Sequence, residues 1–297
     1  TTYTYEAAII MALGEGPLGV RAAWRGKKQL TLAEMGLSVQ AGNNGQAEWS
    51  YLTTNYPNDA RGYSQIAYVY SAAYQLSNNA EVENHSFEID GPLQFSGSIP
   101  DSAPSAFLNY FLTNSQCGVG FPAAKIGSLT AYLQYCAAND IFISPALTEQ
   151  QPAHTTLSLL MKITNSALVW SEGLLKVVPF GDESATANGY TYTPNTTPIY
   201  DLTDDDFIVR GTEDPVIIDR SSTADAYNHV QIECLNRNNQ YNVEMVHARD
   251  LRDIEINGLR SMPPIKCWWI VLPDVAQKAA QLIVNRNLYI RNIYKFF

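Results

Sequence analysis

Apolar side chains recur at every second position in the first part of the chain, and this period restricts the fold more than any other feature. A two-residue period places apolar side chains on one face of a strand, whereas a helix needs a period of about 3.6. The first such segment carries Tyr3, Tyr5, Ala7, Ile9 and Met11 on one face, and the next carries Val20, Ala22 and Trp24. Residues 25–28 form the predicted turn that follows. The sequence therefore predicts a chain that begins as β structure.

Residues 66–73 are apolar or aromatic on both faces of a predicted strand. Tyr68 and Tyr70 share one face, and Ala67 and Val69 share the other. A strand of this kind is covered on both sides. We therefore interpret Tyr68 and Tyr70 as a candidate intersubunit interface, while a strand buried in the protein's own core explains the pattern equally well.

Gly14, Glu15, Gly16 and Pro17 lie between the first two predicted strands. A phosphate-binding loop would need a helix directly after it and a GxGxxG or GxxxxGK(S/T) spacing, and the sequence has neither. We interpret the four residues as a structural turn, in which the two glycines adopt positive φ and the proline fixes the exit. A catalytic use of Glu15 is the alternative.

Helical spacing replaces the alternation after Pro100 and Pro104. One predicted helix follows Ser128 as N-cap, with an apolar stripe of Leu129, Leu133, Cys136 and Ala137. A second predicted helix has a stripe that extends from Leu157 to Ala167 and Leu168. A hairpin turning at residues 171–173 comes next.

The last part of the chain returns to strands. Residues 181–203 are polar and rich in turn formers, which predicts a loop or an irregular hairpin. Two strands are predicted at 227–235 and 241–248, followed by a helix with Asp274 as N-cap and a terminal strand that starts at Leu288.

Composition narrows the classes of function. The chain has 297 residues, of which 46% are hydrophobic and 16% charged, enough for two domains or for one large domain with an insertion. Its 18 Tyr, against 19 Lys and Arg together, indicate uncharged polar and aromatic surfaces of the kind found between proteins. A net charge of -10 argues against a dedicated nucleic-acid binder, because such proteins neutralise phosphates.

The search for chemistry gives no catalytic residue, no cofactor and no metal ligand set. The four cysteines form no CxxC pair, so we expect buried free thiols. His229 and His247 occupy strand positions and fit a hydrogen-bonded structural role. The acidic segment at 201–207 lacks the Gly and Glu of a calcium loop, so we interpret it as a solvated turn. Its candidate acidic patch consists of Asp201, Asp204, Asp205 and Asp206.

Neither the ends of the chain nor its apolar runs indicate targeting. The sequence has no initiator Met, no signal peptide and no apolar run near the ~20 residues that a membrane span needs. We expect a fragment that begins inside a longer protein, is soluble and makes no stable membrane insertion.

Four stretches together resemble the tail-hub proteins of long-tailed bacteriophages and gene transfer agents. The first is ALGEGPLGVRAAWRGKKQ, which is similar to the family's A-L-x-E-G-P opening, and the second combines ARGYSQIAYVYSAAYQL with VENHSFEI. The third is LVWSEGLLKVVPF, and the fourth is DAYNHVQIECLNRNNQYNVEMVHARDLRDIEINGLR, with the family's Tyr-Asn strand pair at Tyr227, Asn228, Tyr241 and Asn242. One departure is Glu83-Asn84-His85-Ser86, where the family often has Asn-Arg-(Ile/Val)-Pro.

The residue pattern predicts a β-rich α+β chain with an inserted small α/β unit, and the resemblance implies that its β parts are tube-type β-barrel hub domains. Residues 1–98 would form the first barrel part, 99–180 the inserted unit, and 181–297 the returning strands, helix and terminal strand that complete the β domains. It also implies a homotrimer in the virion, made in the bacterial host cytoplasm. The trimer would join the tail tube to other tail-tip proteins and let DNA pass without specific binding. Two tube domains in each of three subunits would match a sixfold tube ring.

Two other functions stay open at this point. A cell-wall-active peptidoglycan hydrolase would need two carboxylates in a cleft, and such pairs meet in space rather than in sequence. A carbohydrate-binding tail component would need a row of exposed aromatic side chains on a sheet. Neither has a motif in this sequence, so we expect a structural protein that is not an enzyme.

Overall fold

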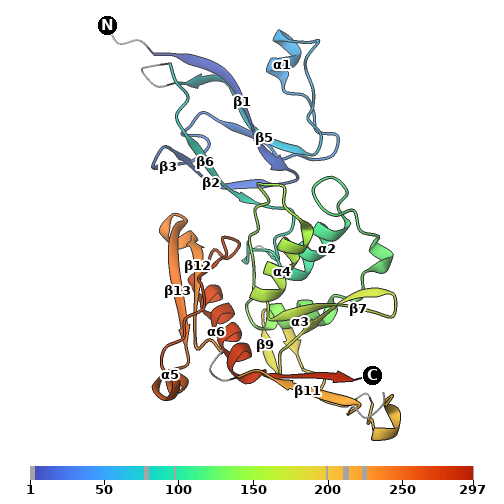
Figure 1. Ribbon diagram of the computed structural model, residues 1–297. Coiled ribbons are helices and arrows are strands. Elements are labelled where there is room, and N and C mark those ends of the chain that lie inside the picture. Colours follow the sequence, from blue (N-terminus) through green and yellow to red (C-terminus); the bar gives the residue numbers. More distant parts are fainter. Residues whose placement is uncertain are drawn as a thin grey trace. The chain divides into compact units, whose positions relative to one another are not determined.

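The computed structural model describes residues 4–76, 80–96, 98–198, 200–209, 214–222 and 226–296. The chain divides into two compact units, Thr1–Pro100 and Asp101–Phe297. Strands form several small sheets, and all helices except the short α1 belong to the second unit among the described residues (Figure 1). The β-rich α+β class predicted from the sequence is confirmed.

The first unit is built from two antiparallel sheets of three strands each. Their orders are β1-β5-β4 and β3-β2-β6. The elements are β1 (Glu6–Glu15), β2 (Gly19–Arg25), β3 (Lys28–Leu30), β4 (Ser38–Gln40), α1 (Ser50–Asn55), β5 (Ile66–Gln75) and β6 (His85–Asp90). Val69 and Tyr74 of β5 share a buried cluster with Ala23 of β2, so both sheets contribute to one core. That core also explains why apolar residues of β1 such as Ile9 and Met11 face inward.

The alternation predicted for residues 20–24 is wrong at one point. The pairing of β2 with β6 shifts register between Val20 and Ala22. A bulge of this kind inserts one residue and exchanges the two faces of the strand beyond it. Ala23 is therefore the residue that is buried beside Val20 in the core, where the sequence pattern predicted Ala22 and Trp24.

The second unit combines the remaining helices with short hairpins. Its first half contains α2 (Pro104–Thr113), η1 (Ala123–Lys125), α3 (Thr130–Ala138), α4 (Ala153–Ile163), β7 (Ser166–Ser171), β8 (Leu174–Pro179), β9 (Ala185–Ala187) and β10 (Tyr190–Tyr192). Its second half contains η2 (Asp204–Asp206), β11 (Val216–Arg220), β12 (His229–Asn236), η4 (Arg237–Asn239), β13 (Asn242–Arg249), α5 (Leu251–Asn257), β14 (Ile265–Lys266), α6 (Pro273–Tyr289) and β15 (Asn292–Phe296).

One hydrophobic core runs through both halves of this second unit. Leu108 of α2 and Tyr132 of α3 belong to the same buried cluster as Ile232 of β12 and Ala276 of α6. The helix α6 packs along β12 and β13, as Figure 1 shows. The pairing β13-β12-β14 and the hairpins β7-β8 and β9-β10 form separate open sheets. Within the described residues, none of these sheets closes into a barrel.

Several predicted boundaries move by a few residues. Ala167 and Leu168 belong to β7, because Asn165 adopts a φ of 46° directly after α4 and ends the helix. Leu272 and not Asp274 is the N-cap of α6, with Pro273 in the first turn, where its missing N–H is harmless. The helix α6 also includes Leu288, so the terminal strand starts later than predicted.

The N-cap and one thiol also differ from the predictions. Leu129 precedes α3 at the N-cap position, while the Ser128 hydroxyl accepts a hydrogen bond from the Thr130 backbone N–H at 3.3 Å. Three cysteines are buried free thiols, as expected, but Cys117 is exposed. Burial raises the pKa of the Cys267 thiol to about 11, so this thiol stays protonated.

Candidate functional site

An aromatic cluster gathers around β5 in the first unit. Its members are Trp49, Tyr51, Tyr56, Tyr63, Tyr68 and Tyr70. The rings of Trp49 and Tyr70 are 4.9 Å apart, and Tyr68 lies 5.7 Å from Tyr63. The segment that contains α1 therefore supplies part of the cover over β5 from within the same chain.

Tyr68 and Tyr70 occupy different depths in this aromatic cluster. Tyr68 is only 1% exposed, and Tyr70 is half-buried. The Tyr68 hydroxyl is buried without a hydrogen-bond partner among the described residues, and burial raises its pKa. Tyr56 and Tyr63 are the exposed members. A partner molecule would thus reach Tyr56 and Tyr63 directly, and Tyr68 packs against Tyr63 while Tyr51 packs against Tyr56.

Residues 14–17 connect the end of β1 to the start of β2. Gly14 has a φ of 155°, whereas Gly16 does not adopt positive φ, contrary to the prediction. The reason for glycine at position 16 is a close approach of two backbones. A Cβ on Gly16 would lie 2.4 Å from the Ala41 carbonyl oxygen and 2.6 Å from the Gly42 Cα.

The acidic segment lies around η2. Asp201, Asp205 and Asp206 are exposed, and the side chain of Asp204 lies outside the described residues. Asp206 accepts hydrogen bonds from the Thr203 backbone N–H at 2.7 Å and from its hydroxyl at 3.1 Å. The backbone hydrogen bond, followed by the hydroxyl, lowers the pKa of Asp206. These carboxylates present negative charge to solvent.

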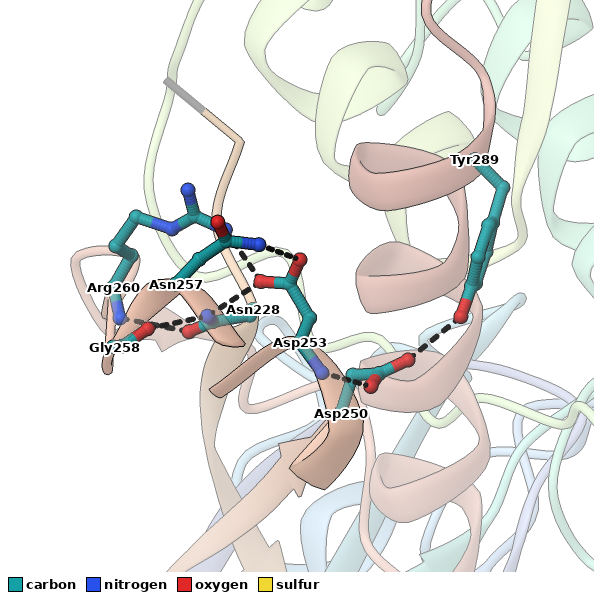
Figure 2. Close-up of polar contacts among 7 residues, drawn as sticks. All are labelled: Asn228, Asp250, Asp253, Asn257, Gly258, Arg260 and Tyr289. Carbon is teal, nitrogen blue, oxygen red and sulfur yellow. Dashed lines mark hydrogen bonds and ion pairs between the residues drawn. The ribbon is translucent and has the colours of Figure 1, made fainter. Parts of the chain in front are cut away.

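A polar network fixes the segment that contains α5 in the second unit, and Figure 2 shows its members. Asn228 is completely buried, and its amide donates to Asp253 Oδ2 at 2.8 Å and to the Gly258 carbonyl at 2.7 Å. The Asn228 side-chain oxygen accepts from the Arg260 backbone N–H at 2.7 Å. Both N–H groups and the oxygen of this buried amide therefore have hydrogen-bond partners.

Two carboxylates complete this network. Asp253 accepts from Asn228, Asn257 and the Arg260 guanidinium, and the Asn228 hydrogen bond is the largest cause that lowers its pKa. Asp250 caps α5 by accepting from the Asp253 backbone N–H at 2.9 Å, and it also accepts from the Tyr289 hydroxyl at 2.7 Å. Since Tyr289 belongs to α6, the network connects α5 to that helix.

Ser261, His229 and His247 form a second chain of hydrogen bonds nearby. Ser261 Oγ lies 2.8 Å from His229 Nδ1, and His229 Nε2 lies 3.1 Å from His247 Nδ1. Burial, followed by the charges of Arg249 and His247, lowers the pKa of His229. The predicted hydrogen-bonded role of both histidines is confirmed. Their contact with each other and with Ser261 was not predicted, because the three residues come from separate segments.

The described residues contain neither a candidate metal site nor a candidate membrane span. In the described ranges, no three His, Cys, Asp or Glu side chains gather closely enough to hold a metal ion. The helices that the structure describes include none with the length and apolar character of a membrane span.

Part of the chain matches a known protein family. A family model described as "Putative phage tail protein" matches residues 152–296. Residues 152–296 thus belong to a phage tail protein family. The matched residues of this phage tail protein include the polar network around Asn228 and the acidic segment, while the aromatic cluster lies outside them. A phage tail protein is a component of the virion.

A solved structure of a virion contains a chain with a similar fold. The chain is similar to one described as "Virion of native gene transfer agent (GTA) particle", with a TM-score of 0.65 and 16% identity. The similarity covers 99% of this chain and 70% of that chain. At this identity it shows a shared fold. No curated protein matches the chain.

Proposed function

We propose that this phage tail protein is a subunit of a homotrimeric hub ring at the distal end of the tail tube. The ring joins the tube to the tip or fibre proteins and lets DNA pass. The observation that carries the proposal is the fold shared with a chain of a gene transfer agent virion over 99% of this chain. Tail-hub sequence patterns in four segments of the chain point to the same role.

The two-unit construction supports a tube-type role. In the first unit, two sheets enclose one core. If the edges of these two sheets were joined, the strands would form a closed barrel. Two barrels in each subunit would give a trimer the six similar units that a sixfold tube ring requires. We assign a structural role to the chain on the strength of its match to a family model described as "Putative phage tail protein".

Charge supports the proposed passage of DNA. The chain has a net charge of -10, and Asp201, Asp205 and Asp206 are exposed. Negative charge on a channel wall repels phosphates and prevents DNA from binding to the wall. The exposed Tyr56 and Tyr63 of the aromatic cluster are the residues we assign to the contact between subunits.

The experiment that tests the hub ring is a mass measurement by light scattering over a range of concentrations, with negative-stain images of the largest species. We expect a trimer with a central opening. A chain that forms only monomers or twofold dimers over the whole range would contradict the ring. A gel-shift assay with linear duplex DNA at physiological salt should show no retarded band.

A further inference from the structure

Two histidines of the second unit share one hydrogen bond, and this contact limits how many protons they hold together. His229 Nε2 lies 3.1 Å from His247 Nδ1, and the two rings are stacked with 5.4 Å between their centroids. A hydrogen bond between two imidazole nitrogens needs one nitrogen with a hydrogen and one without. The contact therefore tolerates one added proton on the pair, whereas a second added proton puts hydrogens on both nitrogens and breaks it.

Ser261 holds the other side of the His229 ring. Its hydroxyl oxygen lies 2.8 Å from His229 Nδ1. A hydroxyl both donates and accepts hydrogen bonds, so this contact fits His229 with or without a hydrogen on Nδ1. We call Ser261, His229 and His247 the histidine latch. The proton-sensitive point of this latch is the contact between its two rings.

The latch holds a segment that has little structure of its own. Residues 258–264 connect α5 to β14 without helix or strand, except for an isolated bridge between Ser261 and His229. The Met262 backbone N–H donates to the His229 carbonyl at 2.8 Å, and the His229 N–H donates to the Arg260 carbonyl at 3.2 Å. Most residues of this segment are exposed. Local opening of the segment therefore costs less free energy than unfolding of the whole unit.

The surroundings of His229 disfavour a positive charge on its ring. His229 is only 4% exposed, and Arg249 lies directly opposite it in the pairing of β12 with β13. Burial, followed by the charges of Arg249 and of the partner histidine, lowers the pKa of His229. The carboxylates of the polar network, Asp250 and Asp253, accept hydrogen bonds from other groups. A doubly protonated pair is therefore stabilised only when the ring reaches water, which requires movement of residues 258–264.

We propose that the histidine latch is an acid-sensitive device, which holds residues 258–264 against β12 at neutral pH and releases them as the solution becomes acidic. The closed latch binds fewer protons than two independent histidines, whose ordinary pKa is about 6.5. Opening therefore becomes more favourable as the pH falls below that value, and a difference of one proton changes the opening equilibrium about tenfold per pH unit. The device belongs to a single copy of the chain, so it does not depend on the proposed hub ring.

The test follows amide exchange of the full chain by NMR between about pH 7 and about pH 5, expressed as protection factors. The Met262 N–H reports on the latch, and the Leu235 N–H, which donates to the Ile270 carbonyl at 3.1 Å, reports on the far end of β12. Protection at Met262 should be lower than at Leu235 and should fall about tenfold or more over this range. Equal protection of both amides at every pH would show unfolding of the whole sheet and would overturn the latch.

Two variants separate the latch from other effects of acid. His247→Asn places an amide where His247 Nδ1 lies, and this amide bonds to His229 without taking up a proton. Its protection at Met262 should fall several times less than in the native chain. The control His154→Asn removes an exposed histidine of α4 and should behave like the native chain. A fall of the same size in all three proteins would overturn the latch.

The ring resonances of the two histidines give an independent readout. In the native chain, His229 and His247 should titrate as a pair in two separate steps, because the first proton hinders the second. In His247→Asn, His229 should titrate in a single step. Two independent titrations in the native chain, both near the ordinary histidine value of about 6.5, would overturn the latch.

Discussion

Asn228 shows at the scale of one residue how a buried polar side chain organises a surface segment. Its amide has no contact with solvent and bonds to Asp253, Gly258 and Arg260. These partners belong to a segment that begins more than twenty positions further along the chain. Removal of the amide would take one hydrogen bond each from Asp253, the Gly258 carbonyl and the Arg260 backbone N–H in a place that water does not reach.

Asn228→Ala should therefore destabilise the protein by about 3 kcal/mol, because buried groups that lose their hydrogen bonds keep their desolvation cost. Asn257→Ala is the matched control, since Asn257 is exposed and makes one bond to Asp253. Urea unfolding followed by circular dichroism gives both values. Equal losses in the two variants would contradict the central role of Asn228.

Asp253 should make the stability depend on pH in the acid range. The hydrogen bond from Asn228 is the largest cause that lowers the pKa of Asp253 below its ordinary value of 3.8. A carboxylate whose folded pKa is lowered stabilises the fold fully above its unfolded pKa, and this contribution disappears as the pH falls through the folded pKa. The loss should therefore begin near pH 4 and increase below it.

The measurement compares native protein with Asp253→Asn in urea at several values between about pH 5 and about pH 2.5. The native protein should lose stability more steeply over this range than the variant, which has no carboxylate to protonate at this position. Parallel curves for the two proteins would show that Asp253 does not contribute.

Arg237 neutralises a carboxylate that is almost completely buried. Its guanidinium binds both oxygens of Asp101, with one of the two contacts at 3.2 Å. Burial lowers the pKa of Arg237, but the hydrogen bond and charge of Asp101 outweigh this effect and raise it. Arg237→Met should cost about 3–5 kcal/mol of unfolding free energy, because the buried Asp101 carboxylate would lose its ion pair and keep the hydrogen bond from the Ser144 hydroxyl. Lys295→Met, which breaks the exposed pair with Asp219, should change stability little.

At the scale of elements, the turn between β1 and β2 depends on the space around one glycine. Gly16 faces the backbone of residues 41 and 42, and its N–H donates to the Gln65 carbonyl at 2.8 Å. A methyl group at this position would force apart the segment that leads into β2 and the residues that follow β4. The turn is thus set by a contact between distant segments as well as by its own four residues.

Gly16→Ala should destabilise the first unit by about 1–3 kcal/mol, the usual effect of overpacking. Gly19→Ala is the control, because nothing lies within 4 Å of a Cβ built there and its φ is not positive. Thermal unfolding of both variants measures the difference. A Gly16→Ala protein as stable as Gly19→Ala would show that the backbones at 16 and 42 can move apart at little cost.

At the scale of the whole molecule, each unit has its own hydrophobic core. Val69 and Tyr74 belong to the core of the first unit, and Leu108 and Ile232 to that of the second. Units with separate cores unfold as separate cooperative blocks when their stabilities differ. Stability changes in distant cores are then additive.

Calorimetry should resolve two transitions that respond to different substitutions. Gly16→Ala should lower the transition of the first unit, and Arg237→Met that of the second. In the double variant both shifts should appear together, with the free energies adding within about 0.5 kcal/mol. A single transition whose midpoint shifts in both variants would indicate one cooperative block.

Local sequence pattern determined many of the elements. The strand β5, the β7-β8 hairpin with its turn at Glu172 and Gly173, and the β12-β13 pair were predicted from periodicity and turn residues. These features depend on positions a few residues apart, which the sequence displays directly. The family resemblance likewise needed no structure to point to a protein of the phage tail.

Tertiary structure alone decided the contacts between distant segments. The bulge at Val20, the core-facing position of Ala23, the depth of Tyr68 and the bonding of Asn228 to Asp253 have no local signal. Asp250 as a helix N-cap was the one part of the polar network that local rules could have suggested. The physical reason is that burial and hydrogen bonding depend on which segments meet, and the order of residues along a single segment does not specify its neighbours.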